Sequence, residues 1–415
     1  MSFPQNDFIN ADYAQLLKTQ FYKSALLFEF MNQNPRYQPL LLKLLSDFKS
    51  RDMEEYFKMV GAAVMSGIMV NKGGWTMIVV PQDNNYEHNC FLLDKLSIDE
   101  TPIDDLQDDY LELRSRPLYK FADGQYLMIY DLFLIKKIYN GSIFYLSSLV
   151  NKDPTLLNGP FFGAIRDDFS EGKLVYDIFD YIFPDKNTIK ISGAQFKKQG
   201  LVISEPDYYI RKWTDILLIE SKDFYVPGKT KLSYDFELIE ADLKKGRLGK
   251  AVEQLRTNIQ RIIIKSLPDI GYDIRNVSIF PVIIVHDALY SAPALNYWVY
   301  FWLDDLIKEM KVDSIYRNFN FEGLWPLTII EIDTLMFYEE NFRMGQLSLI
   351  ELIRQFHTEM DYKEMNILNP EDVKSNAHNS VIPFSEFVRR KAKEIDVQLQ
   401  GGRMNVLFKK LGIPN

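Results

Sequence analysis

A group of acidic and basic side chains within Ser204–Asp223 has the residue types and the spacing for metal-dependent chemistry. Two strand-like runs in this segment flank a short polar Trp-Thr turn, a pattern that is typical of a β-hairpin. A turn centred on that pair places Asp207 opposite Glu220 on the neighbouring strand. It also places Glu205 opposite Lys222. Because residues two apart share a face of a strand, the sequence predicts that all four polar groups converge.

The two facing carboxylates imply a cation between them. Opposite partners in a hairpin have Cβ atoms about 5 Å apart, so Asp207 and Glu220 repel each other unless a positive charge intervenes. Carboxylate oxygens suit Mg²⁺ or Mn²⁺. A lysine beside the ion, here Lys222, can orient a water molecule and offset charge that grows on a phosphate. The set therefore predicts metal-assisted hydrolysis of a phosphodiester.

The same residues carry a resemblance to a known superfamily. Pro206-Asp207 is followed thirteen residues later by Glu220-Ser-Lys222 on the adjoining strand. This arrangement resembles the PD-(D/E)xK nuclease superfamily of restriction enzymes and junction resolvases. The resemblance implies that Asp207 and Glu220 bind the metal and that Lys222 serves the attacking water.

Two further residues match the superfamily outside the hairpin. Many members carry an acid in the first helix of the core, and Glu171 is the candidate for a third metal ligand here. Many also carry a glutamine in the helix after the lysine strand, and Gln254 matches it as a further catalytic residue. The tyrosine or arginine expected four positions later is Asn258 in this chain, which departs from the pattern.

The elements that must position these residues follow an α/β order. The resemblance implies a restriction-endonuclease-like core, a mixed sheet in the order α-β-β-β-α-β. Hydrophobic periodicity predicts the same succession. The predicted helices and strands are Glu171–Phe183, Thr188–Phe196, Leu201–Ile210, Asp215–Tyr225, Leu248–Ser266 and Val277–Val285, followed by the helix Asn296–Met310 and the strand Leu327–Ile332.

The 415 residues predict more than one domain. We expect a mainly helical N-terminal region over 1–150, the nuclease core over 151–335 and a helical C-terminal region over 336–415. In the first region, apolar positions recur at helical spacing in Tyr13–Met31, Gln38–Phe48 and Met53–Val70, with strand-like runs at Trp75–Val80 and Pro117–Ile129.

The Glu-x-Lys pattern alone is not specific, since it also occurs at Glu171 and Glu309 in helical contexts. Only the copy at Glu220 lies on an apolar strand that follows an acid-bearing strand and precedes an amphipathic helix. The alternative interpretation is an ordinary exposed hairpin whose Glu205–Lys222 ion pair contributes less than about 1 kcal/mol.

A basic stretch beside the core is the candidate contact surface for nucleic acid. The basic residues in question are Lys244, Lys245, Arg247, Lys250 and Arg256. Such a helix could neutralise several phosphates. A solvated helix face is the equally open alternative, because runs of charge commonly have only that meaning.

Composition excludes several other classes. With 57 acidic against 48 basic residues, the chain does not coat nucleic acid nonspecifically. One cysteine and four scattered histidines exclude a disulfide framework and a typical zinc site. The sequence has no Walker-type loop, no signal peptide and no apolar run of the roughly eighteen residues that a membrane helix needs. We expect a soluble, cytoplasmic protein.

These observations predict a Mg²⁺- or Mn²⁺-dependent endonuclease. DNA is the expected substrate by analogy with the superfamily, with RNA left open, and defence of a bacterium against foreign DNA is the analogous role. The alternative is a non-catalytic regulatory or scaffold protein that uses the same fold for binding. A homo-oligomer and a protein activator both remain open as partners.

Overall fold

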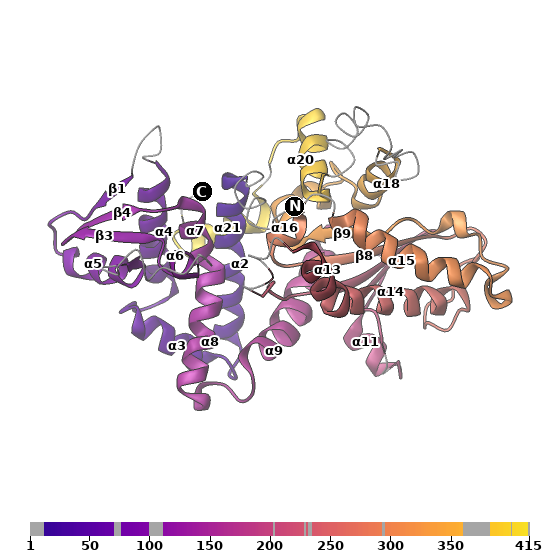
Figure 1. Cartoon of the computed structure of the whole chain (residues 1–415), viewed down its shortest axis with the longest axis horizontal. Helices are drawn as coiled ribbons and strands as arrows, with labels where there is room; N and C mark the ends of the chain where they lie inside the picture. The colour runs from indigo at the N-terminus through magenta and orange to yellow at the C-terminus, as the bar shows by residue number, and fades with distance from the viewer. Residues whose placement is uncertain are drawn as a thin grey trace. The chain divides into compact units, whose positions relative to one another are not determined.

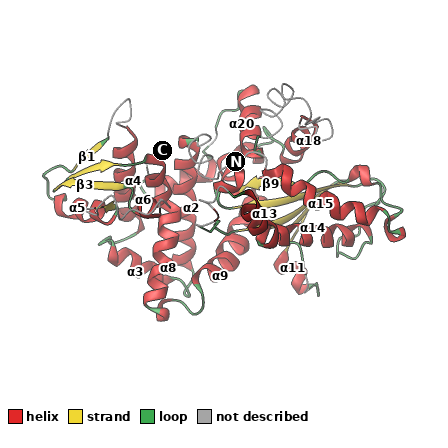
Figure 2. Ribbon diagram, in the orientation of Figure 1, coloured by secondary structure: helices red, strands yellow, loops and turns green. Residues whose placement is uncertain are grey.

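A computed structural model of the chain describes residues 12–69, 76–98, 111–201, 204–227, 230, 235–292, 295–359, 382–399 and 401–413. The chain is mixed α/β and forms two compact units (Figures 1 and 2). One unit comprises Ser170–Gln400. The other comprises Asn10–Phe169 together with Gly401–Asn415.

The larger unit is built on a five-stranded sheet with the order β5-β6-β7-β8-β9. The first three strands pair antiparallel, and β7, β8 and β9 run parallel to one another. The strands are β5 (Ile189–Ser192), β6 (Tyr208–Lys212), β7 (Asp215–Lys222), β8 (Ser278–Val285) and β9 (Thr328–Glu331). Parallel neighbours need crossover connections, which α13 (Phe236–Lys245) with α14 (Arg247–Ile263) and α15 (Leu295–Lys311) supply.

The core of this unit lies between the sheet and these crossover helices. Figure 1 shows α14 and α15 side by side, and both helices contribute to the same apolar cluster. Ile216 and Leu218 of β7 belong to this cluster, whereas Leu217 and Ile219 lie on the opposite face. Helix α14 meets the sheet through an apolar stripe at helical spacing, Val252, Leu255, Ile259 and Ile262.

Most predicted elements of the core are present, with one substantial correction. The predicted strand Thr188–Phe196 divides into β5 and the short helix α11 (Gly193–Lys198). Ser192 ends the strand because its side chain accepts a hydrogen bond from the Gln195 N–H while Gln195 bonds back, forming a capping box. Only the end of the predicted strand Leu201–Ile210 is extended and paired, and its residues 202–203 lie outside the described part.

The predicted helix Glu171–Phe183 is also different in detail. Its first half belongs to a π-helix, η4 (Arg166–Val175), and its second half is α10 (Tyr176–Ile182). A π-helix widens each turn by one residue and is common at functional sites. Glu171 lies within the widened part.

The C-terminal helices do not form a third unit. The larger unit includes α16 (Ile332–Phe337), α17 (Glu339–Arg343), α18 (Leu349–Glu359) and α20 (Phe384–Glu394). The last helix, α21 (Gly402–Lys410), belongs to the smaller unit, where Phe408 contacts Phe21 and Tyr22 at ring distances of 6.4 Å. The described structure thus divides near residue 170 and again near 400, where the sequence suggested 150 and 335.

The smaller unit combines helices with a four-stranded sheet of order β1-β4-β3-β2. Its helices include α2 (Tyr13–Gln33), α3 (Gln38–Asp47), α4 (Met53–Met69), α5 (Tyr86–Lys95), α6 (Leu111–Ser115), α7 (Asp131–Lys136), the π-helix η2 (Lys137–Gly141), α8 (Ser142–Lys152) and α9 (Phe161–Ile165). Its strands are β1 (Met77–Val79), β2 (Ser97–Ile98), β3 (Leu118–Ala122) and β4 (Gln125–Met128).

Candidate active site

The hairpin of β6 and β7 has the predicted register. Tyr208 pairs with Ile219 and Lys212 with Asp215, so the turn consists of the Trp-Thr pair as expected. Trp213 adopts a positive φ of 58°, which closes the two-residue turn. Because the pairing is antiparallel, the residue before β6 faces the end of β7.

That register brings Asp207 to the level of Glu220. The backbone N–H of Ser221 donates a hydrogen bond of 2.7 Å to Asp207 Oδ2. On the other side, the N–H of Gly193 bonds to the carbonyl oxygen of Asp207 at 2.9 Å. Both the side chain and the backbone of Asp207 are therefore fixed by neighbouring elements.

The ammonium group of Lys222 lies between the two carboxylates. Its Nζ atom is 3.3 Å from Glu220 Oε2 and 3.7 Å from Asp207 Oδ2. Burial opposes the charge on Lys222, but the carboxylates of Glu220 and Asp207 more than offset it and raise the pKa of the lysine. The lysine therefore stays protonated at neutral pH and offsets negative charge on the two acids beside it.

Glu220 is the most unusual member of the group. Its side chain is 0% exposed, and its Oε1 atom has no hydrogen-bond partner among the described residues. Burial and the nearby charge of Asp207 raise the pKa of Glu220 well above its ordinary value. A buried oxygen without a partner costs about 1–3 kcal/mol. The site therefore has an acceptor that a further cation or proton can satisfy.

Glu171 approaches the same site from the π-helix. Its charge contributes to raising the pKa values of Lys222 and Tyr176, so it lies within electrostatic reach of both. The preceding Ser170 donates a hydrogen bond of 2.5 Å to Asp223, which directly follows β7. Nevertheless, no three His, Cys, Asp or Glu side chains of the described residues lie close enough together to hold a metal ion. Glu171 is thus near the pair without completing a three-residue cluster.

The expected convergence of Glu205 is wrong. Glu205 forms an ion pair of 2.8 Å with Lys197 of α11 and does not pair with Lys222. The ladder of β6 begins only at Tyr208, so alternation along the strand does not extend back to Glu205. Arg261 also redirects the chain there, because its guanidinium donates a hydrogen bond of 2.6 Å to the carbonyl oxygen of Ser204.

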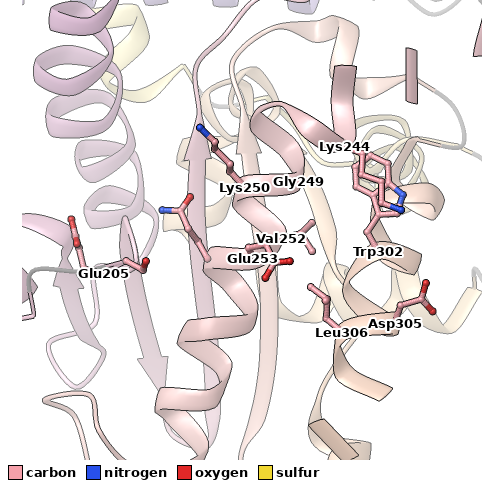
Figure 3. Close-up of a pocket in the computed structure, with 11 residues that line it drawn as sticks. Glu205, Lys244, Gly249, Lys250, Val252, Glu253, Trp302, Asp305 and Leu306 are labelled. Carbon is pink, nitrogen blue, oxygen red and sulfur yellow. The ribbon is translucent and has the colours of Figure 1, made fainter. Parts of the chain in front are cut away.

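Glu205 instead lines a groove with residues of the crossover helices. The groove has a volume of about 770 Å³, and Gln254, Lys244, Lys250 and Trp302 contribute to its walls (Figure 3). Gln254 therefore shares this groove with Glu205, which precedes Asp207 by two residues in the chain. Among the described residues, no hydrogen bond joins Gln254 to the carboxylate pair, so the catalytic role of Gln254 stays a prediction.

The predicted basic surface is only partly assembled. Lys244 and Lys250 line the groove, but Glu205, Glu253 and Asp305 line it too, so its charge is mixed. Arg256 forms an ion pair of 3.5 Å with Glu253. Lys245 is exposed to solvent and does not line the groove. The side chain of Arg247 lies outside the described part.

Sequence reasoning assigned no role to two contacts that support the site. His286 Nε2 lies 2.9 Å from Ser221 Oγ, on the residue between Glu220 and Lys222. Its position at the end of an apolar strand was the available signal, and that position alone favoured a structural role. The bond from Ser170 to Asp223 had no signal in the sequence, because it depends on how the π-helix meets β7.

Comparison of the chain with protein-family models, with curated proteins and with solved structures found no match. Among the described residues, no helix combines the length and the apolar composition that crossing a bilayer requires.

Proposed function

We propose that this chain is a metal-dependent nuclease that hydrolyses phosphodiester bonds, with DNA as the expected substrate. The observation that carries the proposal is Glu220, a fully buried carboxylate with an unsatisfied oxygen that faces a second carboxylate across a hairpin. Purely structural buried carboxylates normally have both oxygens satisfied. A divalent cation bound by the two carboxylates would account for the pair and for the free acceptor together.

The order of elements supports a restriction-endonuclease-like core. A helix, α10, precedes three antiparallel strands, β5 to β7, and the crossover through α14 leads to the parallel strand β8. This is the α-β-β-β-α-β succession that the PD-(D/E)xK resemblance implies, apart from the inserted α11. The acids and the lysine lie where the second and third strands of that core would place them.

Asp207 and Glu220 would hold the ion, with Glu171 as the candidate third acid. When bound, a Mg²⁺ or Mn²⁺ ion polarises a phosphate oxygen and lowers the pKa of a coordinated water. Lys222 stays protonated between the carboxylates, so it can donate a hydrogen bond to a water or to a phosphate oxygen. Glu220 must lose its proton to bind the metal, because its pKa is raised.

The groove beside Glu205 supports a polymer substrate. Lys244 and Lys250 can contact phosphates, and the Trp302 ring offers an apolar surface on the same wall. The acids of the groove lower its net positive charge. This favours phosphate contacts by a few individual lysines over binding along a continuous basic surface. A role in bacterial defence against foreign DNA stays part of the proposal by analogy alone.

The test is cleavage of supercoiled plasmid, single-stranded DNA and RNA by the full chain with Mg²⁺, Mn²⁺ or EDTA. Wild type is compared with Lys222→Met, which removes the charge and keeps most of the stem. Lys212→Met, an exposed position on the same hairpin, is the matched control. We expect metal-dependent cutting that Lys222→Met lowers by roughly a hundredfold or more and that Lys212→Met leaves intact.

Cutting that survives in Lys222→Met at the wild-type rate would overturn the assignment of the site. If neither wild type nor variant cuts any substrate, the melting temperature measured with and without Mn²⁺ distinguishes an inactive metal site from a non-catalytic protein. A rise that Asp207→Ala abolishes supports the metal site and directs attention to an activator. No rise in the wild type rejects the metal site and favours the non-catalytic alternative.

A further inference from the structure

The smaller unit contains a cavity that the proposed nuclease site does not use. It has a volume of about 270 Å³ and lies among α4, α5, η2 and α8. Most of its wall is apolar, with contributions from Phe48, Met59, Val60, Leu92, Leu96 and Phe144. Water in the liquid occupies about 30 Å³ per molecule, so the space equals roughly nine waters. This is large enough for a small ligand.

Two lysines, Lys95 and Lys137, line this apolar cavity. Lys137 has no ion pair and no hydrogen bond among the described residues, and burial lowers its pKa to about 8. Lys95 packs against aromatic faces, with its Nζ atom 4.9 Å from the ring of Phe91 and 5.1 Å from that of Phe48, and it lies within electrostatic reach of Asp47, whose pKa it helps to lower. Among the described residues, neither ammonium group forms a direct ion pair, and only Lys95 has an acid within electrostatic reach.

The π-helix η2 is what gives Lys137 its place. A Cβ atom on Gly141 would lie 2.8 Å from Cδ of Lys137, so the stem of the lysine packs directly against the glycine. A residue with a side chain in place of Gly141 would therefore crowd the stem of Lys137, and the glycine leaves room for it. π-Bulges of this kind are frequent at functional sites.

The other polar groups in the wall are already engaged with one another. Tyr56 Oη and Ser142 Oγ lie 3.1 Å apart, and Tyr145 donates a hydrogen bond of 3.0 Å to Asp47. Asp47 also holds Lys43 at 2.7 Å and is not part of the lining. Among the described lining residues there is no acid, so the two lysines are the charged groups that face the cavity, with Asp47 behind Tyr145 offsetting part of the charge of Lys95.

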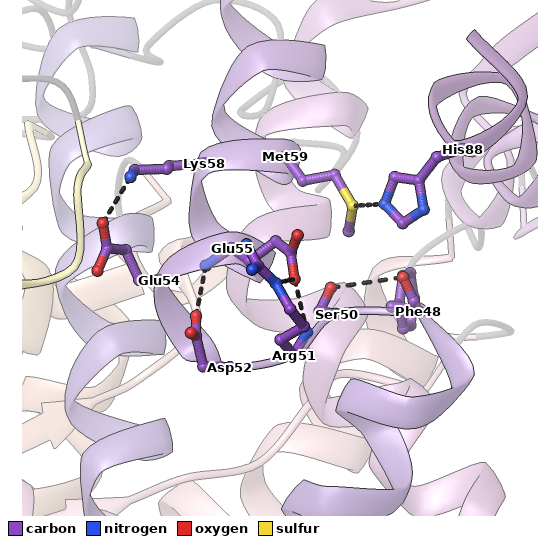
Figure 4. Close-up of polar contacts among 9 residues, drawn as sticks. All are labelled: Phe48, Ser50, Arg51, Asp52, Glu54, Glu55, Lys58, Met59 and His88. Atoms are coloured by element: carbon purple, nitrogen blue, oxygen red, sulfur yellow. Dashed lines mark hydrogen bonds and ion pairs between the residues drawn. The ribbon is translucent and has the colours of Figure 1, made fainter. Parts of the chain in front are cut away.

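The apolar wall is held in position by local contacts. Figure 4 shows His88 of α5 facing Met59 of α4, with His88 Nε2 3.0 Å from Met59 Sδ. The start of α4 is capped by Asp52, whose carboxylate accepts a hydrogen bond of 2.8 Å from the Glu55 N–H (Figure 4). A pre-formed apolar cavity with a few placed charges is the usual form of a small-molecule site.

We propose that this cavity binds a small organic monocarboxylate with an apolar body, whose negative head group is held by Lys137 and Lys95. The apolar wall excludes a fully hydrated inorganic anion, because such an ion would have to shed its water shell against hydrocarbon. The two ammonium groups repel a cation. A neutral apolar molecule could fill the cavity but would leave both ammonium groups without a counter-charge. A chain of about eight carbons or a single aromatic ring with a short acid arm fits the volume.

The test uses octanoate as the probe and octanol as the uncharged control, with the full chain in calorimetric titration and thermal unfolding. We expect octanoate to bind and to raise the melting temperature, with octanol much weaker. Lys137→Met should weaken octanoate binding by roughly tenfold or more, since a charged hydrogen bond is lost. Lys152→Met, an exposed lysine at the end of α8, should leave binding unchanged.

Two further measurements keep the proposal testable if Lys137→Met folds poorly. Ala63→Phe fills the cavity without removing a charge and should abolish binding. In the wild type at pH 8, octanoate should bind with the uptake of roughly half a proton, because Lys137 becomes fully charged. Equal affinity for octanoate and octanol, or unchanged octanoate binding in Ala63→Phe, would overturn the proposal.

Discussion

Lys222 and Lys137 are lysines withdrawn from water in the two units of the chain, and their pKa values shift in opposite directions. At Lys222, two carboxylates within 3.7 Å outweigh the cost of burial and raise the pKa. At Lys137, burial acts alone and lowers the pKa to about 8. Once Glu220 is deprotonated, the carboxylate pair has more negative than positive charge and can accept a cation. The described lining of the cavity has two lysines and no acid, so it can accept an anion.

Neutralising Glu220 tests the first half of this comparison and should have the largest effect. Glu220→Gln keeps the size of the side chain and removes a metal ligand, so we expect metal-dependent cleavage to fall by roughly a hundredfold or more. The Mn²⁺-dependent rise in melting temperature should disappear. The protein without metal should remain folded, because a buried charge has been removed. Cleavage by Glu220→Gln at the wild-type rate would overturn the assignment of Glu220 as a metal ligand.

The raised pKa of Glu220 also predicts how metal affinity depends on pH. Below that pKa the carboxyl is protonated, and the proton must leave before the ion binds. The apparent affinity for Mn²⁺ should therefore increase as pH rises, by up to about tenfold per pH unit, and level off above the pKa. Calorimetric titration in buffers of different ionisation enthalpy measures the released proton. Glu220→Gln should release none.

His357 is a further buried base, and its Nε2 atom lies 2.7 Å from the neutral hydroxyl of Thr328. Burial lowers its pKa to about 3. Unfolding lets the ring take up a proton below its ordinary pKa, so stability is lost as pH falls below about 6.5. The loss at pH 5 should be about 2 kcal/mol. His357→Gln should remove this pH dependence in denaturant unfolding, and His88→Gln should not.

Lys137→Met should change the stability of the protein in the absence of any ligand. The depressed pKa means that the charged amine destabilises the folded state below about pH 8, and the penalty fades as pH rises towards 10.5. At pH 7 the variant should be more stable by up to about 3 kcal/mol, and the difference should fall below about 1 kcal/mol near pH 10. Urea unfolding at the two pH values measures it. A less stable variant at pH 7 would mean that Lys137 has a partner in solution.

The hairpin site was predictable because its geometry is local. The turn residues and the alternation of apolar positions set the register, and that register places Asp207 beside Glu220. The prediction fails at Glu205, only two residues before Asp207, because pairing has ended and Lys197 of α11 captures the carboxylate. The alternation of side chains between the two faces of a strand can be relied on only where the strand is paired, and here the pairing begins at Tyr208.

Other features depend on packing between distant segments, which periodicity does not report. Glu171 comes near Lys222 through a π-helix, and helical spacing in the sequence does not distinguish a π-helix from an α-helix. The cavity around Lys137 needs four helices to meet. The division of the C-terminal region likewise depends on a contact of α21 with α2 that no local pattern marks.

That contact has a consequence for how the chain acquires its structure during synthesis. Phe408 completes the packing around Phe21 and Tyr22, so the smaller unit is interrupted by the whole of Ser170–Gln400. A ribosome adds about 5–20 residues per second, so the aromatic face of α2 waits tens of seconds for its partner. During that interval the nascent chain exposes an apolar surface to its surroundings, and the intervening unit has time to fold first.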